Sequence, residues 1–475
     1  MKKGSIKHTA FFNFYEPKIK DWDMFKKVLI ANRGEIAVRV IRACRELGIP
    51  TVAIYSTADA ESLHVRLATD SYCIGPASSS ESYLDISRIM AVAEVSGADA
   101  IHPGYGFLSE RADFAELCEQ SGIKFIGPTS DAMKKMGDKA TARKTMIENN
   151  VPVTPGTGIL KTADEIIEFG NKVGYPIILK ATAGGGGKGM RVCRGDEDVE
   201  SNFNLCQQEA QNFFGNPGVY AEKFLENPRH IEVQILGDSF GNVIHLGERD
   251  CSIQRRHQKL LEEAPSPAIN EQTRQEMGAA AVRAAKAINY EGAGTCEFLL
   301  DHDGKWYFME MNTRVQVEHC VTEMISRVDI VREQIRVAAG EKLSYTQDDI
   351  KLRGHAIECR INAENPDRDF APCPGKIDGY FAPGGFGIRV DSHVYPGYSI
   401  PPYYDSMIGK LICWGETRNE ARRRMYQALK EYVITGICTT IPFHQNIIED
   451  EVFISGKFNT GFIEDYYKRK EQEQE

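Results

Sequence analysis

The residue types best suited to metal and phosphate chemistry lie in a short acidic segment near residue 300. Residues 295–312 contain two strand-like runs joined by an Asp-Gly turn, which predicts a β-hairpin. Strand alternation places Glu310, Asn312 and Phe308 on one face, with Glu297 on the partner strand. Two carboxylates and an amide form a hard oxygen site that suits Mg²⁺ bound to phosphates. The alternative is a solvated polar strand face, which the neighbouring aromatic residue disfavours.

A run of glycines forms a second candidate site. Gly184 to Gly187 are followed by Lys188 and Gly189, which formally matches GxGxxG. A strand follows where a dinucleotide-binding fold needs a helix, and Gly189 stands where a P-loop needs Ser or Thr. The run therefore predicts a loop at a hairpin tip, whose backbone amides approach phosphate oxygens, with Lys180 beside it. A flexible turn without a ligand is the alternative.

Basic residues gather near residue 255 of an otherwise acidic chain. Arg255, Arg256, His257 and Lys259 form a local positive patch. An anion site for phosphate or bicarbonate and a solvated surface loop both explain such a patch, and both stay open here.

Two further residues are ambiguous by themselves. His230 follows Asn-Pro-Arg and is more often a structural histidine than a catalytic one. Arg360 lies in a strand-like run between Glu358 and Glu364, where a buried ion pair is the alternative to a reactive role.

The elements that must position these residues begin with a predicted parallel sheet. Apolar runs separated by a helical pattern over residues 36–47 give the strand–loop–helix–strand order of a crossover unit. The predicted strands are residues 27–31, 51–55, 99–102 and 124–126.

Further lobes are expected beyond residue 127. The pattern predicts a helix over residues 136–150, strands over 176–181 and 190–193, and alternating strands and helices to about residue 337. A strand at 354–361 opens a region rich in Pro and Gly, and a charged amphipathic helix covers 420–433.

Composition excludes several classes of function. The 475-residue chain has a net charge of −10, which argues against general nucleic-acid binding. Its 12 cysteines stand singly without a CxxC pair, a pattern typical of reduced, mostly buried thiols in a cytosolic protein. No apolar run approaches the ~20 residues of a membrane span. Residues 1–23 are expected to be a tail, or to precede a natural start at Met24.

Together these segments resemble the biotin carboxylase family of the ATP-grasp superfamily, from about Phe25 to Tyr467. The motifs that carry the resemblance are IANRGEIA (30–37), HPGYGFLSE (102–110), MGDK (136–139), KATAGGGGKGMR (180–191), EKFLENPRHIEVQ (222–234), ERDCSIQRRHQK (248–259), EMNTRVQVEH (310–319), GHAIECRINAE (354–364) and PPYYDSMIGKL (401–411). So many specific strings in one order make coincidence implausible.

The resemblance implies an α/β fold of ATP-grasp architecture. An N-terminal parallel-sheet domain, a mobile glycine-loop lid and a larger C-terminal domain are expected. The implied boundaries are an extension at 1–23, the N-terminal domain at 24–127, a helical linker at 128–151, the lid at 152–225 and the C-terminal domain at 226–470. Within that last domain the ATP-grasp core ends at about residue 350, and the C-terminal part covers 351–470.

Matching motif positions imply an ATP site between the lid and the C-terminal domain. Lys139 and Lys180 would hold the phosphates under Gly186 and Gly187. The lid hinge would contact adenine through Glu222, Lys223, Phe224 and Leu225, and the nucleotide pocket would be lined by His230, Gln254 and His257. Glu297 and Glu310, with Asn312, would meet the ATP phosphates through Mg²⁺ or Mn²⁺, two ions being expected.

The same matching implies a bicarbonate site and a reaction. Bicarbonate would be held by Lys259, Arg314, Gln316 and the backbone of Val317, and Glu318 would be the general base that deprotonates it. The carbonate would attack the γ-phosphate to give carboxyphosphate, which splits into CO₂ and phosphate. That phosphate would take the ureido proton of biotin. Arg360 would stabilise the biotin enolate, and Arg314 would clamp the carboxyphosphate.

Two places depart from the family pattern. Ala183 and Lys188 stand where many relatives have Gly and Arg, and small effects on lid closure are expected because the charge is kept. Cys320 follows His319 where Pro is common, beside the implied base, and could change local rigidity.

The resemblance also implies partners. The chain has no Met-Lys-Met biotin-acceptor motif and no carboxyltransferase segment. It is therefore expected to be a separate cytoplasmic subunit, commonly a homodimer, that carboxylates biotin on a biotin carboxyl carrier protein and serves a carboxyltransferase. Acetyl-CoA carboxylase, which begins fatty-acid synthesis, is preferred by family frequency. Pyruvate carboxylase or another acyl-CoA carboxylase is the alternative, and neither nucleic acid nor membrane is expected.

Other classes of function compete with this one. A different ATP-grasp ligase would share the lid and the metal site, but the RVQVE segment and Arg360 favour a biotin carboxylase. A catalytically silent nucleotide-binding regulatory subunit would have no need of Glu318, Lys259 and Arg314 together. A nicotinamide dehydrogenase fails because a strand, not a helix, follows the glycine run.

Overall fold

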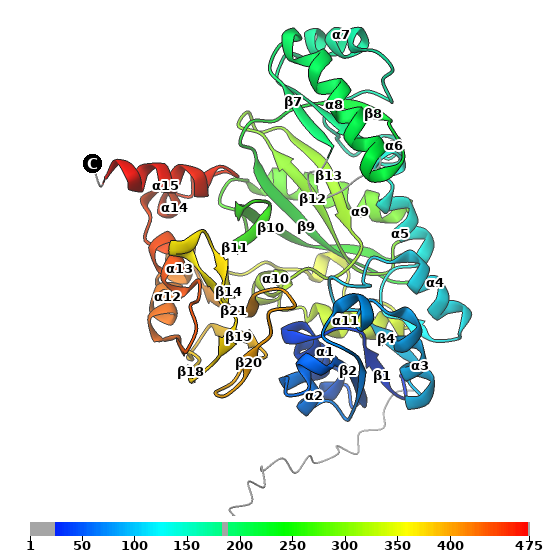
Figure 1. The fold of residues 1–475 in the computed structure, drawn as a ribbon, viewed down its shortest axis with the longest axis vertical. Coiled ribbons are helices and arrows are strands. Elements are labelled where there is room, and N and C mark those ends of the chain that lie inside the picture. Colours follow the sequence, from blue (N-terminus) through cyan, green and yellow to red (C-terminus); the bar gives the residue numbers. More distant parts are fainter. Residues whose placement is uncertain (1–23, 183–188, 474–475) are drawn as a thin grey trace, which may run out of the picture.

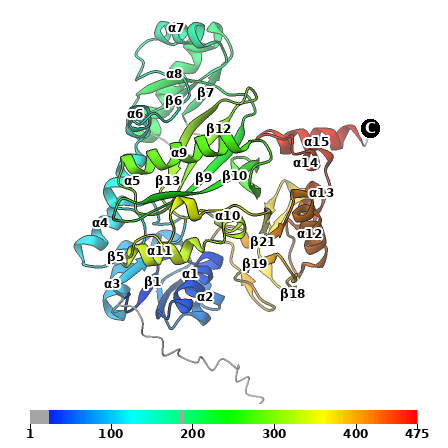
Figure 2. The same ribbon diagram turned by 180° about the vertical axis from the view of Figure 1, so that it is seen from behind.

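The computed structural model describes residues 24–182 and 189–473 of the chain. The predicted N-terminal tail and the predicted phosphate-binding glycines Gly186 and Gly187 lie outside these described residues. Within them the chain has three parts (Figures 1 and 2). A small sheet with its helices lies at the bottom of Figure 1, a second small unit lies at the top, and a large sheet joins them.

The N-terminal part is a parallel sheet, as the sequence predicts. Five strands lie in the order β3-β2-β1-β4-β5, and every neighbouring pair is parallel. The edge strand β3 was not predicted. Its residues alternate between half-buried and exposed positions along most of its length, so it has no apolar run. The elements are β1 (Val28–Ile30), α1 (Gly34–Glu46), β2 (Thr51–Ser56), α2 (Leu63–Leu67), β3 (Asp70–Gly75), α3 (Ile86–Ser96), β4 (Ala100–His102), α4 (Ala112–Gln120) and β5 (Lys124–Phe125).

The predicted helix over residues 136–150 is present as a helix that starts later, because residues 136 and 137 end the preceding helix. α5 (Ser130–Gly137) ends at Asp138, where α6 (Lys139–Glu148) begins. The carboxylate of Asp138 accepts a hydrogen bond of 2.8 Å from the backbone amide of Thr141. An aspartate in this capping position satisfies a free amide and starts a new helix, which explains the break. Lys139 therefore stands on the first turn of α6.

The unit at the top of Figure 1 confirms the hairpin around the glycine run. Its three-stranded antiparallel sheet has the order β7-β6-β8. Lys180 pairs with Met190, so the strands on either side of the run in sequence, β6 and β7, form an antiparallel pair. The elements are α7 (Ala163–Val173), β6 (Ile177–Ala181), β7 (Met190–Cys193), α8 (Asp196–Phe214) and β8 (Val219–Lys223).

The largest element is an eight-stranded antiparallel sheet with the order β13-β12-β9-β10-β11-β14-β21-β19. Its strands come from both the middle and the last third of the chain, so one continuous sheet connects these regions. The strands are β9 (Arg229–Gly237), β10 (Val243–Arg255), β11 (Gln258–Ala264), β12 (Gly292–Leu300), β13 (Trp306–Asn312), β14 (His355–Asn362), β19 (Ile388–Ser392) and β21 (Met407–Gly415).

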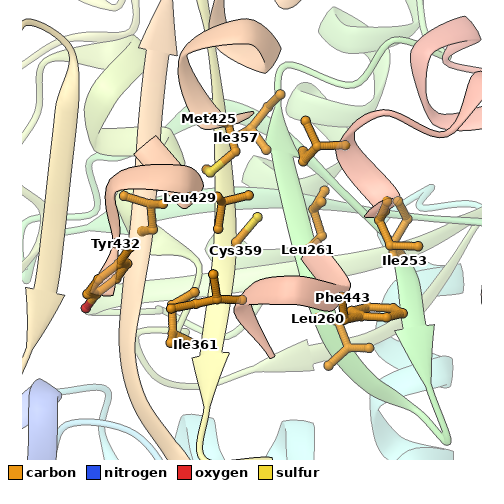
Figure 3. Close-up of a cluster of buried hydrophobic side chains, with 14 of the residues drawn as sticks. Ile253, Leu260, Leu261, Ile357, Cys359, Ile361, Met425, Leu429, Tyr432 and Phe443 are labelled. Atoms are coloured by element: carbon orange, nitrogen blue, oxygen red, sulfur yellow. The ribbon is translucent and has the colours of Figure 1, made fainter. Parts of the chain in front are cut away.

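One face of this sheet is apolar and is covered by two groups of helices. α9 (Glu271–Ala287) covers β9, β10 and β12. α12 (Arg418–Glu431), α13 (Ile441–Ile448), α14 (Glu451–Ser455) and α15 (Phe462–Gln472) gather around the other end. There Leu261, Ile357 and Met425 belong to one buried cluster (Figure 3). Each fully buried side chain of this size stabilises the fold by roughly 1.5–3 kcal/mol.

The opposite face of the sheet carries charged residues. Strand alternation sends Glu232, Glu262 and Arg360 to this side, while their sequence neighbours join the apolar face. Helices α10 (His319–Ser326) and α11 (Ile330–Ala338) pack over parts of it. The charged side chains are therefore enclosed between a sheet and a layer of helices. Among the described residues, no helix combines the length and the apolar character needed to cross a membrane.

Short strand pairs complete the C-terminal region. β15 (Glu364–Asn365) pairs with β16 (Ala371–Pro372), β17 (Gly375–Lys376) with β20 (Ser399–Ile400), and β18 (Gly379–Phe381) with β22 (Val433–Thr435).

Candidate active site

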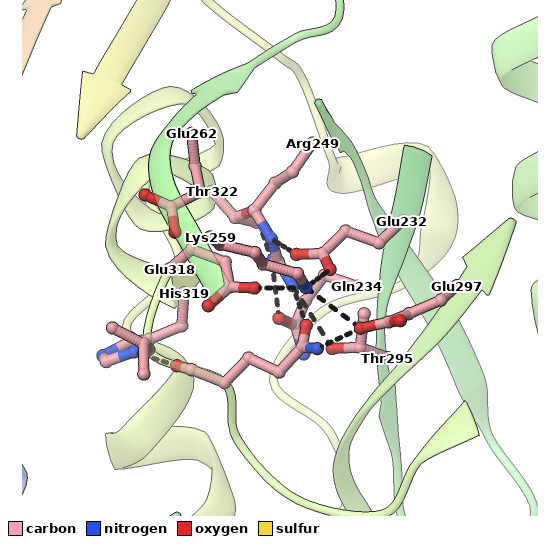
Figure 4. Close-up of polar contacts among 12 residues, drawn as sticks. Glu232, Gln234, Arg249, Lys259, Glu262, Thr295, Glu297, Glu318, His319 and Thr322 are labelled. Carbon is pink, nitrogen blue, oxygen red and sulfur yellow. Dashed lines mark hydrogen bonds and ion pairs between the residues drawn. The ribbon is translucent and has the colours of Figure 1, made fainter. Parts of the chain in front are cut away.

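A largely buried lysine, Lys259, joins three carboxylates on the charged face of the large sheet (Figure 4). Its Nζ atom lies near one oxygen each of Glu232 (2.6 Å), Glu318 (2.7 Å) and Glu297 (3.0 Å). Burial alone would lower the pKa of Lys259, but these carboxylates outweigh it and raise the pKa well above its ordinary value. Lys259 is therefore a fixed positive charge.

Glu318 is held between two cations. Its Oε1 atom accepts from Lys259, and its Oε2 atom lies 2.9 Å from Nη2 of Arg360. Burial would raise the pKa of Glu318, but Lys259, Arg360 and Arg249 lower it well below its ordinary value. The side chain is thus an ionised carboxylate. An anion bound beside these cations would weaken their hold on Glu318 and raise its proton affinity.

Arg249 is a fully buried arginine that sequence reasoning missed. It lies on β10 and forms an ion pair with Glu232. Its remaining donors contact Gln234 (2.8 Å), Gln316 (2.8 Å), Thr322 (2.9 Å) and Thr295 (3.2 Å). All five N–H groups of a guanidinium need acceptors when water is excluded, and this set supplies them. The arginine therefore ties β9, β12, α10 and the loop before α10 together.

The acidic hairpin places its side chains as predicted. Glu297 on β12 stands opposite Glu310 on β13, and Asn312 follows two positions later. One oxygen of Glu297 accepts from Gln316 at 2.7 Å and from Asn312 at 2.8 Å. Its other oxygen lies 3.0 Å from Nε2 of His230, which is buried. Burial would lower the pKa of His230, but the charge of Glu297 raises it above its ordinary value. The histidine is therefore held as an ion-pair partner of Glu297.

Phe308 does not share a face with Glu310, and that prediction is wrong. The β12–β13 register shifts between Glu297 and Phe298, so Phe308 pairs with Phe298 and Met309 is the extra residue. A β-bulge of this kind reverses the alternation on one side of it. Phe308 consequently joins Met311 in the apolar cluster under α9.

The acids of the hairpin fit a divalent cation. Burial and the charge of Glu297 raise the pKa of Glu310, while Lys139 opposes the rise. In the described part of the chain, Glu310 has no hydrogen bond or ion pair, so its oxygens are available. Asn312 turns its amide nitrogen to Glu297 and its oxygen to Arg314, at 2.9 Å. A half-turn of that amide would add a third hard oxygen, a donor set that suits Mg²⁺ or Mn²⁺.

The loop after β13 brings further predicted residues to the same place. Nε of Arg314 donates to Glu110 at 2.9 Å, which connects the loop to the N-terminal part. The carbonyl oxygen of Val317 accepts from Lys410 at 2.7 Å. Gln316 reaches both Glu297 and Arg249. The alternation of polar residues from Asn312 to Glu318 thus persists beyond the strand, as the sequence indicates.

The upper unit groups a second set of predicted residues. Lys180 on β6 lies 2.5 Å from Glu222 on β8, whose other oxygen lies 3.0 Å from Arg143. The Nζ atom of Lys223 donates to two backbone carbonyls at the start of β6. Leu225 is buried just beyond β8, and Phe224 donates its amide to the carbonyl of Pro176. These residues therefore cluster at the edge of the small sheet.

The basic patch around residue 255 divides in two. Arg255 and Arg256 form ion pairs with Asp369, at a partly exposed position. Lys259 instead points into the acid cluster. His257 lies in the turn between β10 and β11 with a positive φ of 65°, and its side chain is exposed. Gln254 pairs in register with Lys259 and is half-buried. Arg255 and Arg256 therefore belong to a surface ion-pair cluster, whereas Lys259 is directed into the acid cluster.

A second layer of charge lies behind Arg360. Its Nε atom lies 2.6 Å from Glu262 on β11, and Glu262 faces Glu358 on β14. Glu358 is fully buried, and neither of its oxygens has a hydrogen-bond partner among the described residues. Burial, with Glu262 and Glu318 nearby, raises the pKa of Glu358 well above its ordinary value. The sequence placed Glu358 beside Arg360 in a strand-like run, but it gave no sign that Glu262 would stand opposite Glu358.

A cavity of about 450 Å³ opens over the cluster. It is lined by the predicted residues Lys259, Arg314, Val317 and Arg360. Residues from the N-terminal part and from the loop before β21 close its other sides, among them Tyr105 and Tyr403. A small organic molecule with polar and apolar faces fits such a space.

Comparison with protein-family models accounts for nearly all of the described chain. Residues 24–133 match the N-terminal domain of biotin carboxylase, and residues 358–465 match the biotin carboxylase C-terminal domain. Between them, residues 138–346 match the ATP-binding domain of the carbamoyl-phosphate synthase large chain.

Individual relatives match over similar lengths. Biotin carboxylase 1 of Bacillus subtilis is 60% identical over 93% of this chain and 99% of its own length. A pyruvate carboxylase subunit of Methanothermobacter thermautotrophicus is 57% identical over 93% of this chain and 90% of its own length. The biotin carboxylase domain dimer of Hydrogenobacter thermophilus 2-oxoglutarate carboxylase, solved with MgADP, ADP and bicarbonate, is 53% identical. That structure gives a TM-score of 0.87 and covers 94% of this chain and 98% of its own.

Proposed function

This chain belongs to the biotin carboxylase family, and from that membership we propose that it is the separate biotin carboxylase subunit of an acetyl-CoA carboxylase. As a biotin carboxylase it is an ATP-dependent carbon–nitrogen ligase that uses bicarbonate to carboxylate biotin. The classes of other ATP-grasp ligases and of silent regulatory subunits are thereby set aside. The roles of individual residues and the identity of the acyl acceptor are the content of the proposal.

Bicarbonate would bind beside Lys259 and Arg314, with Gln316 and the backbone of Val317 completing the site. The observation that carries this proposal is the ionised Glu318 held between Lys259 and Arg360. The cations attract bicarbonate. The negative charge of the bound bicarbonate then partly cancels the effect of these cations on the pKa of Glu318. Glu318 then becomes basic enough to take the bicarbonate proton.

The carbonate so formed would attack the γ-phosphate of ATP. Its product, carboxyphosphate, is an anion that Arg314 would hold by charge. Because Arg314 is also bound to Glu110, its guanidinium is already oriented before substrate arrives. Carboxyphosphate would split into CO₂ and phosphate, and this phosphate would remove the ureido proton of biotin.

Biotin would occupy the 450 Å³ cavity with its ureido group at Arg360. When that group loses its proton, negative charge develops on its oxygen. Arg360 is a permanently charged donor held by Glu262 and Glu318, so it is oriented in advance for that oxyanion.

ATP would lie between the upper unit and the large sheet. Lys180 and Lys139 would meet its phosphates under Gly186 and Gly187, and the segment from Glu222 to Leu225 would contact the adenine. His230, Gln254 and His257 would line the rest of that pocket. Two Mg²⁺ or Mn²⁺ ions would be held by Glu297, Glu310 and Asn312, and their charge would neutralise the ATP phosphates during transfer.

The reaction is tested by ADP release from the whole chain with Mg-ATP and bicarbonate, with and without free biotin. We expect ADP release that needs bicarbonate and rises strongly with biotin. ADP release that needs bicarbonate but does not change with biotin would be consistent with Glu318 as the base and would contradict the proposed biotin site. Release without any bicarbonate dependence would contradict both.

The acyl acceptor is a separate part of the proposal. The chain is 60% identical to a bacterial biotin carboxylase and 57% identical to part of a pyruvate carboxylase, so pyruvate carboxylase or another acyl-CoA carboxylase is the second candidate. The proposed partners are a biotin carboxyl carrier protein and a carboxyltransferase in the cytoplasm, with the chain as a homodimer.

Reconstitution distinguishes the two candidates. The chain is mixed with the biotinylated carrier and carboxyltransferase that its own genome encodes, for acetyl-CoA and for pyruvate in parallel. Malonyl-CoA formation at a higher kcat/KM for the acetyl-CoA carrier supports the proposal, whereas preferred oxaloacetate formation contradicts it.

A further inference from the structure

Two cysteines that the proposed reaction does not use lie next to each other in the C-terminal region. The backbone amide of Cys438 donates to the Sγ atom of Cys373 at 3.1 Å, across 65 positions of sequence. Cys438 is exposed and Cys373 is half-buried, while nine of the other ten cysteines are buried. The prediction of mostly buried thiols is thereby confirmed, and this pair, with the separate Cys73, stands within reach of solvent reagents.

The backbone holds the two segments side by side. The amide of Asp378 donates to the carbonyl of Thr435 at 2.9 Å, where β18 and β22 begin to pair. A Cβ atom on Gly436 would lie only 2.3 Å from the carbonyl oxygen of Lys376, so the backbones are in direct contact there. A disulfide spans Cα separations of about 4.4–6.8 Å, and the contact between the Cys438 amide and the Cys373 sulfur shows that the two backbones lie close together at this point.

Both cysteine segments are also attached to the end of β14. The Oγ1 atom of Thr440, two residues after Cys438, donates to the carbonyl of Arg360 at 3.0 Å and accepts from the amide of Asn362 at 3.0 Å. The amide of Cys373 donates to the carbonyl of Ala363 at 2.7 Å. A disulfide between the two cysteines would therefore join, by a covalent bond, the two segments that are hydrogen-bonded to the end of β14. That strand carries Arg360.

We propose that Cys373 and Cys438 form a reversible disulfide that fixes the end of β14, with a low-molecular-weight disulfide as the oxidant. The Cys438 thiolate attacks one sulfur of the small disulfide and releases a thiolate. The Cys373 thiolate then attacks the Cys438 sulfur of this mixed disulfide and releases the second thiolate. Two protein thiols are oxidised, the small disulfide is reduced by two electrons, and the cysteine protons pass to the released thiolates.

The chemistry of the pair sets its pH dependence. The hydrogen bond to the Cys373 thiol raises the pKa of Cys438, so the Cys438 thiol is mainly protonated near neutrality. Because the thiolate is the nucleophile, the rate of disulfide formation should rise as the pH is increased above neutrality.

The bond is tested by treating the whole chain with oxidised glutathione at pH 8, trapping free thiols with iodoacetamide and analysing proteolytic peptides by mass. We expect a linked peptide joining Cys373 to Cys438 and the loss of two thiols per chain, both reversed by dithiothreitol. Cys73→Ser is the matched control, because Cys73 is the other exposed cysteine, and it should leave the linked peptide unchanged. Cys438→Ser should abolish it. Glutathione adducts on Cys438 without any linked peptide would overturn the proposal.

The second half of the proposal concerns β14. Hydrogen exchange at the amides of Asn362 and Thr440 is compared between the oxidised and reduced chain, without ATP or biotin. Exchange should slow several-fold on oxidation and recover on reduction. A linked peptide with unchanged exchange at both amides would overturn the fixing of β14. These measurements need no enzyme turnover, so they stand or fall independently of the proposed function.

Discussion

Arg360 and Glu318 share an ion pair of 2.9 Å that connects β14 to the beginning of α10. The same guanidinium is bound to Glu262, so Arg360 cannot follow Glu318 freely. In the proposed reaction Glu318 accepts a proton and loses its charge, which weakens its bond to Arg360. That donor of Arg360 then becomes available to the oxygen of biotin. The ion pair thus links the two halves of the proposed reaction.

Glu318→Gln removes the proposed base while keeping the size of the side chain. We expect bicarbonate-dependent ADP release to fall by roughly 10²–10⁴-fold, the usual contribution of general acid–base catalysis. ATP binding should be unchanged, because Glu318 is bound to Lys259 and Arg360 and not to the upper unit. Calorimetric titration with a non-hydrolysable ATP analogue checks this. Retention of more than a tenth of the activity would contradict the role of Glu318.

Arg249→Met should move the acid limb of the pH profile. Arg249 lowers the pKa of Glu318 without touching the cavity, so its removal raises that pKa. Glu318 is then protonated at a higher pH than in the wild type, and kcat/KM for bicarbonate falls earlier on acidification. Arg229→Met is the matched control, since Arg229 is a buried arginine paired with Asp250 at 2.7 Å in the same sheet. It should lose stability but keep the acid limb in place. Equal shifts in both variants would contradict the role of Arg249.

Glu310→Gln should weaken metal dependence more than nucleotide binding. Two facing carboxylates bind a hard cation better than one, so the Mg²⁺ concentration for half-maximal activity should rise at least ~10-fold. Asp303→Asn changes an exposed acid in the turn of the same hairpin and should have no effect. The measurement is ADP release titrated with Mg²⁺ at fixed ATP. An unchanged Mg²⁺ requirement in the first variant would remove Glu310 from the metal site.

Sequence reasoning predicted the framework well because periodicity is a local property. The parallel sheet, the hairpin around the glycine run and the acidic hairpin all follow from short runs of alternating or apolar residues. It failed where one residue changes the local rule. Asp138 ends one helix and starts another, and the extra residue Met309 moves Phe308 to the opposite face.

Sequence reasoning identified the residues that surround the proposed bicarbonate and metal sites, but not the charged residues behind them. Lys259 and Glu318 lie in motifs that carry the family resemblance, Glu297 lies in the predicted acidic hairpin, and the structure brings the three together. Arg249 and Glu358 also stand in such motifs, but no local residue pattern gives either of them a role. Their roles depend on which strands are adjacent, and adjacency in an antiparallel sheet is not contained in any local pattern.

Glu358→Gln should stabilise the fold at alkaline pH. The pKa of Glu358 is raised on folding, so the acid is neutral in the folded chain and ionised in the unfolded chain above about pH 4.5. Its stability contribution is complete below that pH and is lost as the pH rises toward the raised folded pKa. A glutamine has no such dependence, so the variant should exceed the wild type by about 1–3 kcal/mol at pH 8 and by little at pH 5.

Glu263→Gln provides the opposite sign on a neighbouring strand. Burial would raise the pKa of Glu263, but His355 and Arg418 lower it to about 2. Its contribution is therefore present above the unfolded value of about 4.5 and is lost only as the pH falls through 2, so this variant should lose about 3 kcal/mol at neutral pH. Urea midpoints measured from pH 5 to pH 9 decide the matter. The midpoint of Glu358→Gln should rise relative to the wild type across this range while that of Glu263→Gln stays uniformly low. Parallel curves for Glu358→Gln and the wild type would contradict the raised pKa of Glu358.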